Sequence, residues 1–95
     1  MMVGGFHAAQ AATQEVQEII EQVRDTVAGQ IGDVGEYIAH SFRSQVVAGT
    51  NYNVKVHISG DQYVHIKVYV PLPYTHQPPQ LKECETGKVE SDPIH

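Results

Sequence analysis

Two consecutive runs of alternating apolar and polar residues constrain the fold of this chain more than any other feature. The alternation covers residues 52–58 and again residues 64–70. A period of two is typical of a β-strand with one buried face. The short polar link at residues 60–62 predicts an antiparallel hairpin between the two strands. Matching their apolar faces across that link places Val56 opposite Ile66.

A helical pattern precedes these strands. Residues 13–28 are predicted to form one helix, with Thr13 as the N-cap and Gly29 as the residue that ends it. Its aliphatic stripe has helical spacing and consists of Val16, Ile19, Ile20, Val23 and Val27. Residues 29–35 hold three glycines, which favour an irregular connection into the sheet.

Further strands are predicted on both sides of the hairpin. Residues 38–46 form one candidate, with Ile38, His40 and Phe42 on its apolar face. The proline-rich residues 71–79 favour a loop, and residues 81–89 form a final edge strand.

Together these elements predict an α+β fold, in which one N-terminal helix is wrapped by a four- to five-stranded antiparallel sheet. The sheet should occupy about residues 36–90, and residues 1–12 are expected to form a flexible arm. A chain of 95 residues can enclose one hydrophobic core, so residues 1–95 are expected to be a single domain.

Charge and cysteine content exclude several classes of partner and location. The formal net charge is −5 and no basic run occurs, so neither nucleic acid nor an anionic membrane surface is an expected partner. Cys84 is the single cysteine, so no intramolecular disulfide can form and a reducing compartment is favoured. The start of the sequence lacks the basic and apolar regions of a signal peptide. We therefore expect a cytoplasmic protein.

Catalytic and metal-binding alternatives are weak. Cys84 could act as a nucleophile, but the adjacent Glu83 and Glu85 would raise the pKa of its thiol, so a plain edge-strand cysteine is favoured. The expected hairpin register places His57 opposite His65, yet two imidazoles without a third ligand make a poor metal site. We expect no catalytic residue, no metal and no cofactor.

Residues 45–52 stand out because three small apolar residues occupy a hairpin tip where polar turn residues are usual. Val46, Val47 and Ala48 could form a contact surface there. From the pattern alone, a strand that simply runs longer explains them equally well.

The same segment carries a family resemblance. Gln45-Val46-Val47-Ala48-Gly49 matches the Gln-x-Val-x-Gly motif of the cystatin superfamily, and residues 45–52 resemble the corresponding stretch of stefins, the type 1 cystatins. Other matching stretches follow in the same order along the chain, namely Met1-Met2-x-Gly4, Ala12-Thr13-x-Glu15, Val64-His65-Ile66-Lys67-Val68 and Leu72-Pro73. The chain is therefore identified as similar to intracellular cysteine protease inhibitors of the cystatin A and B type.

The resemblance implies a function as a reversible, tight-binding, competitive inhibitor of papain-like cysteine proteases, and not as an enzyme. It implies that an N-terminal arm and two hairpin loops occlude the active-site cleft of the protease. The protease-binding residues that it implies are Met2, Val3, Gly4, Gln45, Val46, Val47, Ala48, Gly49, Leu72 and Pro73. Expected partners are papain and cathepsins of the B, L, H or S type. The inhibitor itself is expected to be a monomer, with a domain-swapped dimer possible. The alternative is a cystatin-fold interaction module with a non-protease partner.

Overall fold

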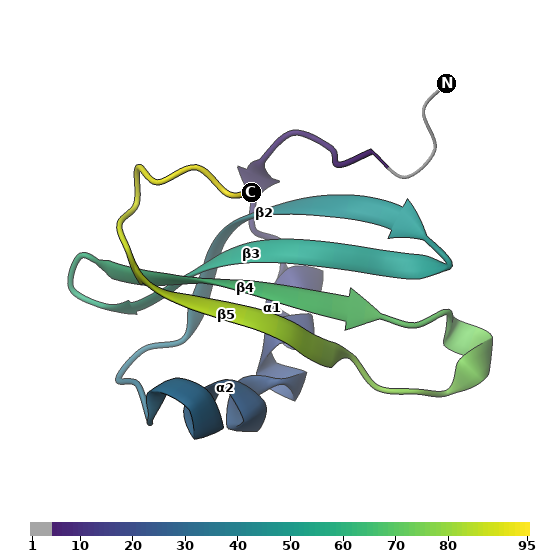
Figure 1. Ribbon diagram of the computed structural model, residues 1–95, viewed down its shortest axis with the longest axis horizontal. Helices are drawn as coiled ribbons and strands as arrows, with labels where there is room; N and C mark the ends of the chain where they lie inside the picture. Colours follow the sequence, from purple (N-terminus) through teal and green to yellow (C-terminus); the bar gives the residue numbers. More distant parts are fainter. Residues whose placement is uncertain (1–4) are drawn as a thin grey trace.

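The computed structural model describes residues 5–95 and shows two short helices packed on one antiparallel sheet (Figure 1). In chain order the elements are β1 (Gln10–Ala11), α1 (Gln14–Gln22), α2 (Arg24–Ile31), β2 (Ile38–Val47), β3 (Gly49–Ser59), β4 (Gln62–Val70), the 3₁₀ turn η1 (Pro73–Thr75) and β5 (Gln80–Lys88). The strands lie in the sheet in the order in which they occur in the chain. This arrangement confirms the predicted α+β fold class.

The helical region begins as the sequence predicts but ends later. Val16 donates its backbone N–H to the Thr13 hydroxyl at 3.2 Å, so Thr13 is the N-cap. The helix is interrupted at Val23, where φ is −106° and ψ is 8°, and it resumes as α2. The predicted end at Gly29 is wrong, because α2 runs on to Ile31 and is followed by Gly32 at φ +85°. At positive φ with ψ at 172°, Gly32 has a backbone conformation that favours glycine.

The aliphatic stripe of the two helices packs against the inner face of the sheet. All five predicted stripe residues are buried, together with Val54, Val56, Val64, Ile66 and Val68 of the sheet. Each buried Val or Ile stabilises the fold by roughly 1.5–3 kcal/mol. Tyr37 completes this core and donates its hydroxyl to the Ile20 carbonyl at 2.8 Å, which ties the start of β2 to α1.

A β-bulge changes the facing of residues at the start of β2. The register of β2 against β3 shifts between Ala39 and Ser41. As a result Ile38 is 55% exposed, whereas Phe42 is buried in the core. His40 is exposed as well, and its Nε2 lies 3.5 Å from a carboxylate oxygen of Glu90. The prediction that Ile38, His40 and Phe42 share an apolar face is therefore wrong, because an inserted residue reverses the alternation.

The β3–β4 hairpin is shifted by two residues from the predicted register. Val56 faces Val64 and not Ile66, while Ser59 faces Gln62 across the turn. A shift by two keeps every side chain on its predicted side of the sheet, because successive side chains alternate. The predicted apolar face is therefore retained although the pairing differs.

The last residues of the chain cover the outer face of the sheet, opposite the helices. Residues 90–95, called the C-terminal strap below, fold back over this face toward β2 (Figure 1). Lys55 donates its ammonium group to the carbonyls of Glu90 and of Asp92, the latter at 2.6 Å. Ile94 of the strap is 7% exposed. The strap therefore buries polar residues of β3 that alternation alone would place in solvent.

The predicted flexible arm is partly ordered. Residues 1–4 lie outside the described part of the chain, but β1 pairs with β2 through Gln10 opposite Phe42 and Ala11 opposite Ser41. Ala12 also donates its N–H to the His40 carbonyl at 3.1 Å. The second half of the predicted arm thus belongs to the sheet. Within residues 5–95, no helix has the length and apolar character needed to cross a bilayer.

Candidate functional site

Two apolar loops meet at one end of the sheet. The turn between β2 and β3 and the segment that follows β4 both lie at the end of the molecule drawn on the right in Figure 1. Register explains the proximity, since Thr50 at the start of β3 pairs with Val70 at the end of β4. The loop that follows β4 therefore begins beside the β2–β3 tip.

The β2–β3 tip projects aliphatic side chains into solvent. Val46 is 60% exposed and Val47 is 40% exposed, and Ala48 at the turn is exposed too. Gln45 is half-buried, and its side-chain oxygen accepts a hydrogen bond from Asn51 Nδ2 at 2.9 Å. Strand β2 therefore extends to Val47, as expected if the apolar residues only lengthen the strand. Its last two residues are still exposed to solvent.

Gly49 allows this tip to fold tightly. Its φ is +110°, and a Cβ at this position would lie 2.5 Å from the Val70 carbonyl oxygen and 2.9 Å from the Tyr69 hydroxyl. Tyr69 in turn donates its hydroxyl to the Ala48 carbonyl. Gly49 is therefore buried against β4, and the fold needs a glycine there. Tyr69 holds the turn closed, and the sequence analysis did not single it out.

The second loop begins with Leu72, which is half-buried, and Pro73, which is exposed. Thr75 stabilises the single 3₁₀ turn, because its N–H and its hydroxyl both donate to the Leu72 carbonyl, at 3.0 and 2.7 Å. This turn presents Tyr74, which is 75% exposed and was missed by the sequence analysis. An aromatic residue next to a Leu-Pro pair in a loop was the signal that could have identified it.

The third expected component of the site is only partly visible. Met2, Val3 and Gly4 lie outside the described residues, so their expected contacts stay a prediction. Residues 5–8, called the arm stem below, run beside β2 in the direction of the tip, and His7 donates its N–H to the Ser44 carbonyl at 2.9 Å. The chain therefore approaches the tip from this side.

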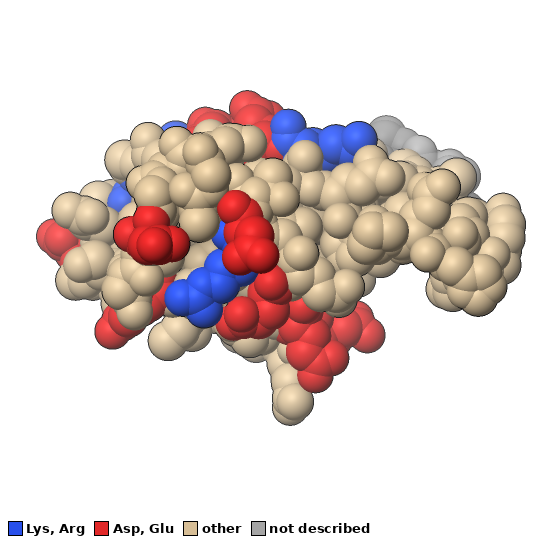
Figure 2. All heavy atoms as spheres, turned by 90° about the horizontal axis from the view of Figure 1, so that it is seen from below, with Lys and Arg blue, Asp and Glu red and all other residues tan. Residues whose placement is uncertain are grey.

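The chain segments that form the two loops contain no acidic or basic residue other than histidine, and the ammonium group of Lys82 lies 5.9 Å from the centre of the Tyr69 ring. In the sequence, residues 44–54 and residues 68–81 contain no Asp, Glu, Lys or Arg. Figure 2 shows the same end as a tan surface, with the charged side chains gathered over the rest of that face. An exposed aliphatic and aromatic surface without charge is typical of the central part of a protein–protein interface.

The residues weighed for catalysis and metal binding are not assembled into a site. Cys84 is partly buried against the core, and burial, followed by the charge of Glu85, raises the pKa of its thiol. His57 pairs with Tyr63 across the hairpin, so the expected pairing of His57 with His65 is wrong. Within residues 5–95, no cluster of three or more His, Cys, Asp or Glu side chains could hold a metal ion.

Comparison with known proteins agrees with this geometry. A cystatin domain profile matches residues 4–92. The chain belongs to the cystatin family. Cystatin-A1 of Sus scrofa is 41% identical to it over 99% of this chain and 92% of its own length. Cystatin-B of Homo sapiens is 40% identical over 99% of this chain and 97% of its own length.

Another relative is named for its activity. Leukocyte cysteine proteinase inhibitor 1 of Sus scrofa is 39% identical over 99% of this chain and 92% of its own length. Members of the cystatin family are protease inhibitors and not enzymes. The expectation that this cystatin domain has no catalytic role is thereby confirmed, as is its resemblance to stefins.

Proposed function

We propose that this cystatin domain is a reversible, tight-binding, competitive inhibitor of papain-like cysteine proteases, such as papain and cathepsins of the B, L, H or S type. The observation that carries the proposal is the end of the sheet where two loops without acidic or basic residues expose Val46, Val47 and Tyr74. The name of the porcine relative, a cysteine proteinase inhibitor, supports the same class of target. The inhibitor acts as a cytoplasmic monomer.

Inhibition works by occupying the active-site cleft. The proposed contact residues are those of the arm, the tip and the second loop, namely Met2, Val3, Gly4, Gln45, Val46, Val47, Ala48, Gly49, Leu72 and Pro73, to which we add Tyr74. A protease must bind an extended peptide before its nucleophile can attack. The tip cannot extend, because Tyr69 holds the Ala48 carbonyl and Gly49 packs directly against Val70. The tip therefore fills the cleft without presenting a cleavable bond.

Rigid loops make such binding efficient. Transferring an exposed Val from water into the cleft yields roughly 1.5–3 kcal/mol, and an aromatic side chain yields more. Association costs at least about 4 kcal/mol in lost translational and rotational freedom, and ordering of loops adds to that cost. Because the tip and η1 are already held by hydrogen bonds, little further ordering opposes their burial.

The test is a matched pair of charge insertions at exposed valines. Val47→Glu places a carboxylate at the tip, whereas Val89→Glu places one at the far end of β5, and the two valines are 40% and 45% exposed. A carboxylate buried without a partner in the complex costs about 3–5 kcal/mol, in addition to the lost apolar contact. Val47→Glu should therefore raise the inhibition constant for papain by about two orders of magnitude or more.

The control defines the contradicting result. Val89→Glu should inhibit like the unmodified protein, and both variants should keep its circular dichroism spectrum, because both side chains lie on the surface. Equal inhibition constants for the two folded variants would remove the tip from the interface. Binding of a non-protease partner through the same tip would then become the better hypothesis.

A further inference from the structure

Arg43 on β2 lies where the two ends of the chain meet. Its Nε donates to the His7 carbonyl of the arm stem at 3.0 Å, and its Nη1 donates to the Ile94 carbonyl of the C-terminal strap at 3.1 Å. Its guanidinium carbon also lies 5.6 Å from the centre of the Phe6 ring, within the range of a cation–π contact. One side chain thus contacts both the arm stem and the C-terminal strap.

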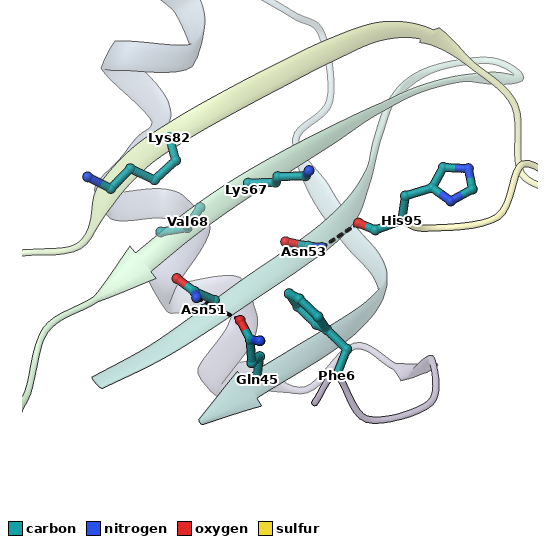
Figure 3. A pocket seen from close by; sticks show the side chains of 8 residues that line it. All are labelled: Phe6, Gln45, Asn51, Asn53, Lys67, Val68, Lys82 and His95. Atoms are coloured by element: carbon teal, nitrogen blue, oxygen red, sulfur yellow. Dashed lines mark hydrogen bonds between the residues drawn. The ribbon is translucent and has the colours of Figure 1, made fainter. Parts of the chain in front are cut away.

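The strap provides a fixed point for this contact. Ile94 is buried, Asn53 donates its side-chain amide to the His95 carbonyl, and Lys55 holds the carbonyl of Asp92. Figure 3 shows Phe6 and His95, from opposite ends of the chain, on the same face of the sheet with Asn53 between them. Both residues help to line a cavity of about 300 Å³ on this face.

Arg43 supplies two of the contacts that attach the arm stem to β2. The stem is attached to β2 by the His7 N–H to Ser44 carbonyl bond and by the two contacts from Arg43. Beyond it, toward the N-terminus, lie the residues that the proposed function places in the protease cleft. The N-terminal arm therefore leaves the sheet at residues that Arg43 contacts.

We infer that Arg43 is a positioning residue for protease binding, which anchors the arm stem to the C-terminal strap and so directs the N-terminal arm toward the β2–β3 tip. This inference rests on the proposed function and deepens it. Neither Arg43 nor the strap needs to touch the protease. They act by reducing the conformational freedom that the arm loses when the complex forms.

The geometry of the side chain explains why an arginine is needed. A guanidinium group presents several N–H donors in a rigid, planar fork, so it can bind two carbonyls that lie in different directions. A lysine at this position would keep the positive charge, but all its donors lie on one nitrogen, which can bind two carbonyls only where these lie close together. Arg43→Lys should therefore retain only part of the effect.

The experiment compares Arg43→Gln and Arg43→Lys with the control Arg24→Gln in the full-length chain. Arg24 also stacks on a ring, 5.2 Å from the centre of Tyr37, and pairs with Glu21 at 3.7 Å, but it lies on α2 and contacts neither terminus. Two quantities are measured. One is the hydrogen-exchange rate of the His7 amide in the free inhibitor, and the other is the dissociation rate of the papain complex.

We expect the His7 amide to exchange at least about fivefold faster in Arg43→Gln, since opening of the stem becomes easier. The papain complex should dissociate about three- to tenfold faster with a nearly unchanged association rate, because losses in one interface fall mainly on release. Arg43→Lys should lie between this variant and the unmodified protein. Arg24→Gln should change neither quantity.

A second substitution tests the strap separately. Ile94→Ala shortens the buried anchor of the strap and leaves the arm stem itself unaltered. It should speed exchange of the His7 amide, by less than Arg43→Gln does, because the carbonyl that fixes one side of the guanidinium becomes mobile. Unchanged exchange in folded Ile94→Ala would overturn the role assigned to the strap.

The outcomes separate this inference from the proposed function. Unchanged His7 exchange in folded Arg43→Gln overturns the inference, and so does faster exchange with unaltered release from papain. In both cases papain is still inhibited and the proposed function stands. If the unmodified protein fails to inhibit papain, the proposed function and the positioning role fail together, while the exchange rates still show whether Arg43 holds the stem.

Discussion

Replacement of Gly49 by alanine should cost more stability than the replacement of any other turn glycine in the described chain. The added Cβ would lie 2.5 Å from the Val70 carbonyl oxygen, a distance that real Cβ atoms essentially never show, and the backbone at φ +110° is itself unfavourable for an L-residue. Backbone strain of this kind costs about 1–3 kcal/mol, and relief of the contact would require β3 and β4 to separate. We expect a total loss of about 2–4 kcal/mol in the free energy of unfolding.

Gly60→Ala is the matched control for this prediction. Gly60 also has a positive φ, +46°, in a hairpin turn, but no atom lies within 4 Å of its hypothetical Cβ. Only the backbone strain remains there, which should cost about 1–2 kcal/mol. Urea unfolding followed by circular dichroism measures both variants, and a similar slope in denaturant would show that the two unfold alike.

The reasoning is refuted if the two alanine variants lose the same stability, or if Gly49→Ala loses none. The same comparison corrects an expectation from sequence. From the sequence alone, a charged residue at position 49 is expected to leave the fold largely intact, because a hairpin tip lies in solvent. The structure contradicts this, because Gly49 itself is buried against β4. Loss of inhibition in a Gly49 variant would therefore report on folding as well as on contact, which is why Val47 is the better position to test.

Three further predictions follow from the structure and the proposed function. Deletion of residues 1–4 should accelerate release from papain about five- to hundredfold without changing the melting temperature, as measured by progress curves and thermal unfolding, and a fall of several degrees would assign the arm to the fold. Raising the ionic strength from about 0.05 to 0.5 M should change the dissociation rate of the papain complex by less than about twofold, since the two contact loops contain no Asp, Glu, Lys or Arg, and a steep salt dependence of release would contradict this. Burial, followed by the charges of Lys55 and Lys88, lowers the pKa of His65, so the unfolded chain binds the proton more readily and stability should fall as the pH drops below about 6.5. Unfolding free energies measured between about pH 7 and 5 should show a smaller decrease for His65→Gln, and identical decreases would refute this role.

Much of the fold could be predicted from the sequence because it depends on periodicity. The helical stripe from Val16 to Val27 and the alternation of β3 and β4 each indicate one buried face, and both faces are found in the core. Thr13 was predictable for a similar reason, since a hydroxyl before a helical pattern caps a helix locally. Such features depend on near neighbours in the chain.

The structure differs from the sequence prediction where residues that are distant in the chain determine the local conformation. The bulge between Ala39 and Ser41 reverses the facing of Ile38, and alternation alone cannot show where an extra residue is inserted. Lys55 looks like a solvent-facing residue until the strap, more than thirty residues away, covers it. Gly29 resembles a helix end by residue type, but α2 continues to Ile31 and the glycine with positive φ after it is Gly32.

The candidate site likewise contains residues that could be predicted from the sequence and residues that could not. Val46, Val47 and Ala48 were identified because apolar residues at a hairpin tip are unusual, and the structure leaves them exposed. Tyr69 was missed because its contact with the Ala48 carbonyl depends on the pairing of β3 with β4. Tyr74 was missed because neither periodicity nor the family motif includes it, although its place next to Leu72-Pro73 was a signal that could have identified it.

The central claim is that this end of the molecule occludes the cleft of a papain-like protease, and titration of papain tests it most directly. Papain of known active-site concentration is mixed with increasing amounts of the 95-residue chain, and residual hydrolysis of a small peptide substrate is measured. The account predicts a linear loss of activity that ends at one inhibitor per active site, relief by added substrate, and recovery of the intact chain from the complex. Serine and metalloproteases should be unaffected under the same conditions. Undiminished papain activity with an excess of folded inhibitor, or cleavage between Val46 and Gly49 as inhibition proceeds, would contradict the account.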